Sequence, residues 1–174
     1  MKRACAVALL VLCGCVSQPQ SYAPPMQRNA YSGPDTRFLK HFIAMNDPHA
    51  MEHVLRDVGD SLQSESWRWT GKRPLFRFLV PATSKLRLVW DFNLPDEVMG
   101  QVKPLTIRYT VNGHELDKVV YPAAGMQHFE KAVPAEWLVA GEDTMAGAEL
   151  DKIFIAPEDK VQLGLALARV GFRD

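Results

Sequence analysis

From residue 67 to the end of the chain, apolar and polar residues alternate in a series of short runs. The run KLRLVWDFNL at 85–94 is the clearest, because every second side chain in it is apolar: Leu86, Leu88, Trp90 and Phe92. The same alternation recurs at 75–80, 105–111, 114–121, 126–133 and 161–172. A period of two with one polar face predicts strands of antiparallel sheets that bury one side and leave the other in water.

The dipeptide Asn112-Gly113 lies between two of these runs. A two-residue type I′ turn needs a positive φ at both central positions, which Asn and Gly adopt readily, so the pair predicts a hairpin. Other turn signals, rich in Pro, Gly and Asp, separate the remaining runs. Short strands at this spacing predict a mostly β domain, an antiparallel β-sandwich of jelly-roll type.

The segment DTRFLKHFIAM at 35–45 differs, because its apolar residues fall near a helical spacing. We expect one short amphipathic helix there, with Asp35 or Thr36 as its N-cap and Asn46-Asp47-Pro48 as its break. A helical turn could begin at Pro48, and we expect the chain to become extended over 53–58.

The first residues have the parts of a secretory signal: the basic pair Lys2 and Arg3, then a short apolar run that ends at small residues. The run is about half of the ~20 residues that span a bilayer. Its end, LCGC at 12–15, resembles the lipobox of bacterial lipoproteins, with Cys13 where Ala or Ser is more usual. The resemblance implies that Cys15 becomes the first mature residue and carries a diacylglyceryl thioether. Ordinary cleavage and release is the alternative.

These features divide the chain into a signal peptide (1–14), a lipidated cysteine with a flexible tether (15–34) and a single domain (35–174). The tether is rich in Pro, Ser, Gln and Asn, and it lacks apolar periodicity, so it has little surface to bury. A lipoprotein with two or more acyl chains is held stably at a membrane. Because no Asp follows Cys15, the resemblance implies the outer membrane of a bacterial cell envelope, facing the periplasm.

Charge and cysteine content narrow the function classes. The chain has 20 basic and 20 acidic residues, and loss of the signal removes basic ones only, so nothing favours a nucleic acid partner. All 3 cysteines lie at or before Cys15. The mature domain therefore has no thiol for a disulfide, a metal site or a nucleophile, and we expect no cofactor.

Several segments resemble a bacterial β-sandwich module of the galactose-binding, carbohydrate-binding type: VLRDVGD, WRWTGKRPLFRF, LRLVWDFNLPDEV, YTVNGHEL, VPAEWL and LGLALARVGF. They fall within 54–172 and are mostly core and turn positions, so the resemblance implies the fold and names no ligand residue. Similar modules are attached to envelope proteins and to glycan-assembly enzymes.

The main candidate for ligand binding is SWRWTGKR at 66–73, which interleaves two tryptophans with cations: Trp67, Arg68, Trp69, Lys72 and Arg73. In an extended chain the two rings share one side. An exposed ring can stack on the C–H face of a sugar while charged groups bond its hydroxyls. The alternative is that both rings cover the end of the core.

The motif HAMEH at 49–53 matches H-x-x-E-H, a zinc signature in which two histidines share a helix face. His49 and His53 are therefore a candidate metal pair, although Pro48 and the extended pattern that follows leave little room for such a helix. Carboxylate pairs at 96–97, 142–143 and 158–159 lie in predicted loops, where a calcium site is the alternative to solvated charge.

No serine lies in a G-x-S-x-G elbow, and no glycine-rich loop follows a strand and opens a helix. We therefore expect no catalytic residue. The sequence predicts a membrane-anchored, non-catalytic binding or scaffold protein that contacts an envelope saccharide or an envelope protein. A hydrolase that acts on an envelope polymer is the alternative.

Overall fold

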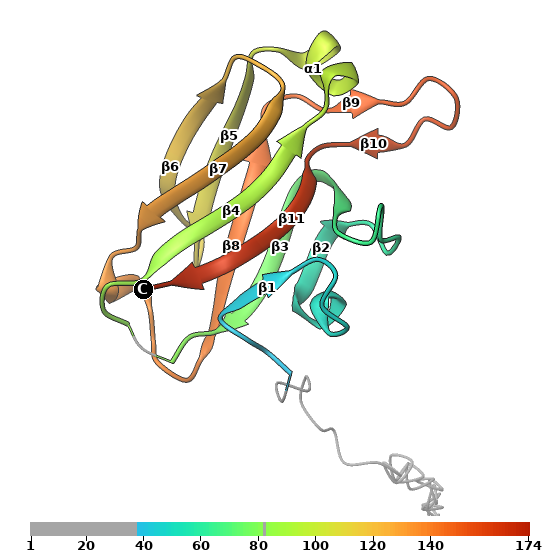
Figure 1. The fold of residues 1–174 in the computed structure, drawn as a ribbon. Helices are drawn as coiled ribbons and strands as arrows, with labels where there is room; N and C mark the ends of the chain where they lie inside the picture. Colours follow the sequence, from blue (N-terminus) through green and yellow to red (C-terminus); the bar gives the residue numbers. More distant parts are fainter. Residues whose placement is uncertain (1–37, 82) are drawn as a thin grey trace, which may run out of the picture. The chain divides into compact units, whose positions relative to one another are not determined.

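The computed structural model describes residues 38–81 and 83–174. Strands dominate this part of the chain (Figure 1). In chain order the elements are β1 (Phe42–Ala44), the 3-10 turn η1 (Ala50–His53), β2 (Val54–Val58), β3 (Arg68–Leu79), β4 (Arg87–Leu94), α1 (Asp96–Val102), β5 (Leu105–Val111), β6 (His114–Tyr121), β7 (Gly125–Ala132), η2 (Ala135–Trp137), β8 (Asp143–Leu150), β9 (Phe154–Ile155), β10 (Gln162–Leu163) and β11 (Ala166–Arg173).

The long strands form two antiparallel layers. In one layer the order is β6-β5-β8-β3, with β2 also paired to β3, and in the other it is β7-β4-β11, with β1 beside β11. Figure 1 shows β7, β4 and β11 in front of β6, β5 and β8. The start of β3 joins the layers, because Trp69 pairs with Ala166 of β11. The predicted mostly β, antiparallel sandwich is confirmed.

The inner faces of the two layers supply the hydrophobic core. Trp90 of β4 is fully buried, and the centroid of its ring lies 5.6 Å from that of Phe76 in β3 and 5.9 Å from that of Tyr109 in β5. The apolar positions that the alternation assigned to the inner face of β3, β4 and β5 are all buried. Burial of apolar surface, at about 25 cal/mol per Å², is the main favourable term in such a core.

The hairpin predicted at Asn112-Gly113 connects β5 and β6. The φ angle is +48° at Asn112 and +83° at Gly113, as a type I′ turn requires. The side chain of Asn112 also joins two other segments: its Nδ2 donates to the Trp137 carbonyl at 2.7 Å, and its Oδ1 accepts from the Met145 N–H at 2.7 Å. Asn112 therefore shapes the turn and holds β8 and the end of η2 beside it.

The helix predicted over 35–45 is wrong for residues 38–45. Phe42–Ala44 forms the edge strand β1, antiparallel to β11, with Ile43 opposite Val170. Ile43 and Met45 are buried, which is a spacing of two. The apolar residues are dense enough to satisfy a helical or an extended period, and β11 offers an unpaired edge that an extended segment can join. Residues 35–37, with both N-cap candidates, lie outside the described residues.

The next segment agrees better with the prediction. The turn η1 begins at Ala50, soon after Pro48. The extended part, expected from His53, begins one residue later with β2 at Val54.

The sequence pattern missed α1. Asp96 and Glu97, predicted in a loop, form the first turn of this helix, so that prediction is wrong. Glu158 and Asp159 lie in a turn as expected. In the described residues, no helix is long and apolar enough to span a membrane.

The sequence pattern also missed β8, which begins at Asp143, so the loop predicted at this residue is wrong. This strand lies between β3 and β5, and its centre is Ala146-Gly147-Ala148. A Cβ at Gly147 would come within 2.8 Å of Thr110 Oγ1. The crowded position excludes the large β-branched and aromatic residues that normally signal a strand.

We expect Gly171→Ala to destabilise the domain much more than Gly113→Ala. Both residues have positive φ, +142° and +83°, so any side chain strains the backbone there. A Cβ at Gly113 meets nothing within 4 Å, whereas at Gly171 it would lie 2.4 Å from the His41 carbonyl oxygen. Urea denaturation should show a loss of about 1 kcal/mol for Gly113→Ala and at least about 2 kcal/mol more for Gly171→Ala. Equal losses would contradict the close approach of the segment before β1 to β11.

Candidate functional site

The two tryptophans of the predicted site lie together at the start of β3. Trp67 precedes the strand and pairs with Gln63, and Trp69 is the second residue of the strand. The rings meet edge to face, with centroids 5.1 Å apart. Both residues are half-buried, and Trp69 packs against the core. The pair is thus anchored by packing and still reaches solvent, and ligand binding by these rings stays a prediction.

Arg68 lies between the two tryptophans in sequence, and its side chain makes structural hydrogen bonds to the backbone. Successive side chains of a strand point to opposite faces, so Arg68 lies on the face away from its neighbours. Its Nε donates to the Met45 carbonyl at 3.1 Å, and its guanidinium also donates to the Asp60 carbonyl. Arg68 thereby fastens β3 to the end of β1 and to the loop after β2.

Lys72 and Arg73 lie farther along β3, beside the outer face of the β6-β5-β8-β3 sheet. Lys72 lines a groove of about 320 Å³ on this face. Arg73 Nε lies 3.9 Å from Glu149 Oε1. Inside the groove, Arg108 donates to Glu149, and this hydrogen bond is the main reason why the pKa of Glu149 is lowered. The residues of the predicted site are therefore separated. The two tryptophans form a pair, Arg68 bonds backbone carbonyls, and Lys72 and Arg73 lie at the charged groove.

The groove was not predicted, because its residues come from strands that are distant in sequence. Arg108 of β5 is opposite Lys118 of β6 on one side and Glu149 of β8 on the other. The alternation marks Arg108 as a polar outward position. Only the order of the strands shows which outward residues become neighbours.

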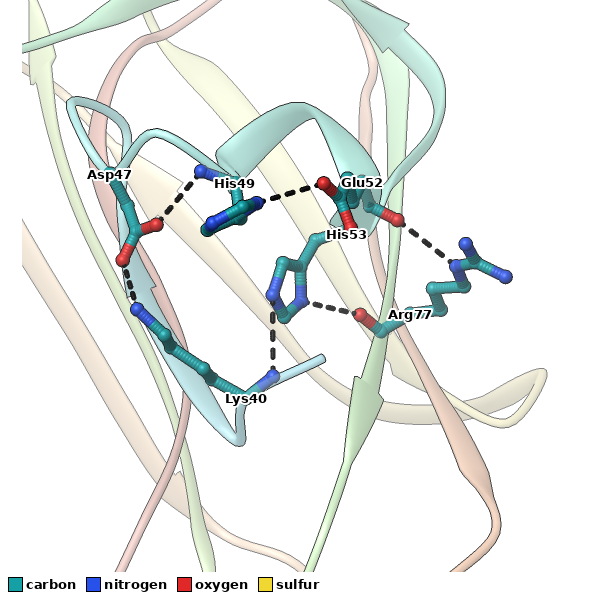
Figure 2. A network of polar contacts seen from close by, with 6 residues as sticks. All are labelled: Lys40, Asp47, His49, Glu52, His53 and Arg77. Carbon is teal, nitrogen blue, oxygen red and sulfur yellow. Dashed lines mark hydrogen bonds and ion pairs between the residues drawn. The ribbon is translucent and has the colours of Figure 1, made fainter. Parts of the chain in front are cut away.

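His53 is buried and bridges two segments (Figure 2). Its Nδ1 donates to the Arg77 carbonyl at 2.9 Å, and its Nε2 accepts from the Lys40 N–H at 3.3 Å. A carbonyl oxygen only accepts and an amide N–H only donates, so the ring is neutral and carries its proton on Nδ1. Burial lowers the pKa of His53. The ring thus fastens the segment before β1 to β3.

His49 and His53 do not form a metal pair. His49 Nδ1 lies 2.8 Å from Glu52 Oε1 (Figure 2), and the His49 ring stacks on Phe38. Both ring nitrogens of His53 are used by backbone groups, so neither lone pair is left for a metal. Among the described residues, no group of three or more His, Cys, Asp and Glu side chains is placed to hold a metal ion.

A second set of polar side chains, also missed by the sequence pattern, lies on the outer face of the β7-β4-β11 sheet. Asp91 of β4 was expected to face water, yet it is only 8% exposed. His128 Nδ1 of β7 lies 2.6 Å from Asp91 Oδ1, and Arg169 Nε of β11 donates to Asp91 Oδ2 at 2.9 Å. The hydrogen bond to Asp91 raises the pKa of His128. These side chains join three strands across the sheet.

No protein-family model and no curated protein matches the sequence. The solved structures that match include two family 35 carbohydrate-binding modules. The module from an environmental isolate has 10% identity and a TM-score of 0.44, and covers 79% of this chain and 93% of its own. The module from Clostridium thermocellum has 9% identity and a TM-score of 0.40, and the match covers 68% of this chain and 88% of the module. A likeness of this degree decides neither the family of this chain nor its ligand.

We expect the burial of the neutral His53 ring to make the domain less stable in mild acid. The unfolded chain takes up a proton near the ordinary pKa of 6.5, whereas the buried ring has a lower pKa and excludes it. The free energy of unfolding is therefore fully present above pH 6.5 and falls as the pH drops toward the lowered pKa of His53. Urea denaturation at pH 7 and pH 5 measures this loss.

The matched variant is His53→Gln, which has no titrating ring. It should unfold more easily at pH 7 and should lack most of the loss between the two pH values. The raised pKa of His128 changes the free energy of unfolding in the opposite direction and above pH 6.5. The lowered pKa of Glu149 changes it below pH 4.5. Neither group therefore imitates the effect of His53. An unchanged pH dependence in His53→Gln would show that this histidine does not cause it.

Proposed function

We propose that the chain is a lipid-anchored, non-catalytic binding protein of a bacterial cell envelope, and that it contacts an envelope saccharide through Trp67 and Trp69. The observation that carries the proposal is the edge-to-face pair at the start of β3, with both rings half-buried and 5.1 Å apart. The packing of Trp69 against the core holds the pair in one orientation. A preformed aromatic surface binds without first losing side-chain freedom.

The chemistry of the rings favours a saccharide. An aromatic side chain offers a large apolar face, and the indole N–H adds one donor. The C–H groups on one face of a sugar ring fit against that apolar face, and the hydroxyls remain free for polar neighbours. Such contacts are individually weak, and they suit a protein held at a membrane, because confinement raises the effective concentration of its partner.

The anchor is proposed from the sequence. Cys15 and the signal peptide lie outside the described residues, so the support is the match of Leu12, Gly14 and Cys15 to a lipobox. We propose that the acylated Cys15 holds the domain at the outer membrane, on its periplasmic side. An envelope protein that uses the same aromatic surface is the alternative partner.

The hydrolase alternative has no observation in its favour in residues 38–81 and 83–174. The histidines of the H-x-x-E-H motif are engaged elsewhere, and no metal-holding cluster occurs among these residues. The buried Asp91 with His128 and Arg169 is an ion network across a sheet face.

We expect Trp67→Ala to weaken saccharide binding at least about tenfold, which corresponds to about 1.4 kcal/mol, without unfolding the domain. A glycan array probed with the full-length protein identifies a bound saccharide, and calorimetry with that saccharide gives the affinity. Trp137→Ala is the matched control, because Trp137 is another half-buried tryptophan and its ring stacks on His114, away from the pair. Saccharide binding that survives Trp67→Ala and Trp69→Ala would place the site elsewhere, with the loop and helix at 95–100 as the next region to test.

We expect Cys15→Ala to abolish the anchor. Wild-type protein made in a bacterial host should partition into the detergent phase and carry the mass of its acyl chains. The variant should retain its signal peptide and lack that mass, because the thiol that accepts the diacylglyceryl group is gone. Detergent partitioning and intact-mass spectrometry measure both effects. A variant that is still acylated and processed would contradict the assignment of Cys15.

A further inference from the structure

The groove on the outer face of the β6-β5-β8-β3 sheet carries cations and carboxylates in equal number. Its charged lining residues are Lys72, Arg108, Lys118, Glu115, Glu149 and Asp151. They come from four neighbouring strands and the residue that follows β8, so the groove crosses the sheet. Its volume of about 320 Å³ is at the lower end of the ~300–1,000 Å³ found for small-molecule sites.

The centre of the groove is held in place by its own contacts. The Arg108 guanidinium donates to Glu149 and lies 3.8 Å from Glu115 Oε2. Asp151 Oδ1 accepts from the Thr106 N–H at 2.8 Å, which leaves Oδ2 for another partner. The carboxylates therefore stand ready as acceptors, and the arginine that links two of them keeps them in position.

Lys72 and Lys118 differ from Arg108, because their ammonium groups are not engaged by the carboxylates of the groove. Lys72 is close enough to Glu149 to help lower the pKa of that carboxyl group, yet its ammonium group makes no hydrogen bond or ion pair within the described residues. The ammonium group of Lys118, on the β6 side, likewise has none there. Each ammonium group offers three N–H donors. The groove thus has unused donors at its two sides and fixed acceptors between them.

We propose that this groove is a second ligand site, separate from the tryptophan pair, and that it takes an uncharged, hydroxyl-rich ligand: a short neutral saccharide. Lys72 and Lys118 donate to its oxygens, and Glu149 and Asp151 accept from its hydroxyls. A hydroxyl both donates and accepts, so a ring with several hydroxyls can use both kinds of group at once. Three cations and three carboxylates line the groove, and Arg73 lies beside Glu149, so the field that would draw an anion into the groove is weak.

The test is a titration of the full-length protein, followed by NMR, in a detergent without a sugar headgroup. The probes are cellobiose, maltose, lactose and N,N′-diacetylchitobiose, with galacturonate and inorganic phosphate as charged comparisons. At least one uncharged disaccharide should shift the backbone amides of Arg108, Lys118 and Glu149 in a saturable way. Lys118→Ala and Glu149→Gln should each raise its dissociation constant at least fivefold.

Lys85→Asn is the control for charge, because Lys85 is an exposed lysine outside the groove and Asn tolerates its φ of +65°. It should leave the titration unchanged. Trp67→Ala should also leave the groove shifts unchanged, which separates this site from the proposed aromatic one. The inference is wrong if no disaccharide shifts the groove amides, if only galacturonate or phosphate does, or if Trp67→Ala abolishes the groove shifts.

Discussion

The double pairing of β3 is the constraint on which the rest of the structure depends. Its first residues pair with β11 in one layer, and its later residues pair with β8 and β2 in the other. A single strand therefore closes one end of the sandwich and places Phe76 and Phe78 in the core. The same strand carries the tryptophan pair at the junction of the layers and Lys72 beside the groove. Both proposed ligand surfaces thus keep their places because β3 cannot shift in one sheet without breaking its register in the other.

The alternation of side chains was sufficient to predict much of the fold. Strand β4 was read correctly down to its inward residues, because an antiparallel strand with one wet face has a clear period of two. The pattern was insufficient where tertiary packing overrides local preference. β8 is crowded by Thr110 and has a glycine at its centre, and β1 takes its form from the unpaired edge of β11. Such information lies in the partner strand rather than in the segment itself.

The candidate site could also be predicted only in part from the sequence. The run SWRWTGKR was recognised as unusual, but a strand turns successive side chains to opposite faces, so Arg68 was separated from the rings that flank it. The groove depends on Arg108 and Glu149, which are 41 residues apart in sequence. Sequence reasoning finds residues that are close along the chain, whereas a sheet brings together residues that are close in strand order.

The turn at Asn112-Gly113 is also a site where the side chain can change chemically with time. An asparagine before glycine is prone to deamidation, because the small glycine lets the next backbone nitrogen attack the side-chain amide. The product carries a carboxylate, which accepts hydrogen bonds but does not donate them. The Met145 N–H would keep an acceptor, while the Trp137 carbonyl would lose the donor that Asn112 Nδ2 now supplies at 2.7 Å. Deamidation of Asn112 would therefore release the end of η2 from the hairpin. The contact between the hairpin and β8 through the Met145 N–H would stay in place.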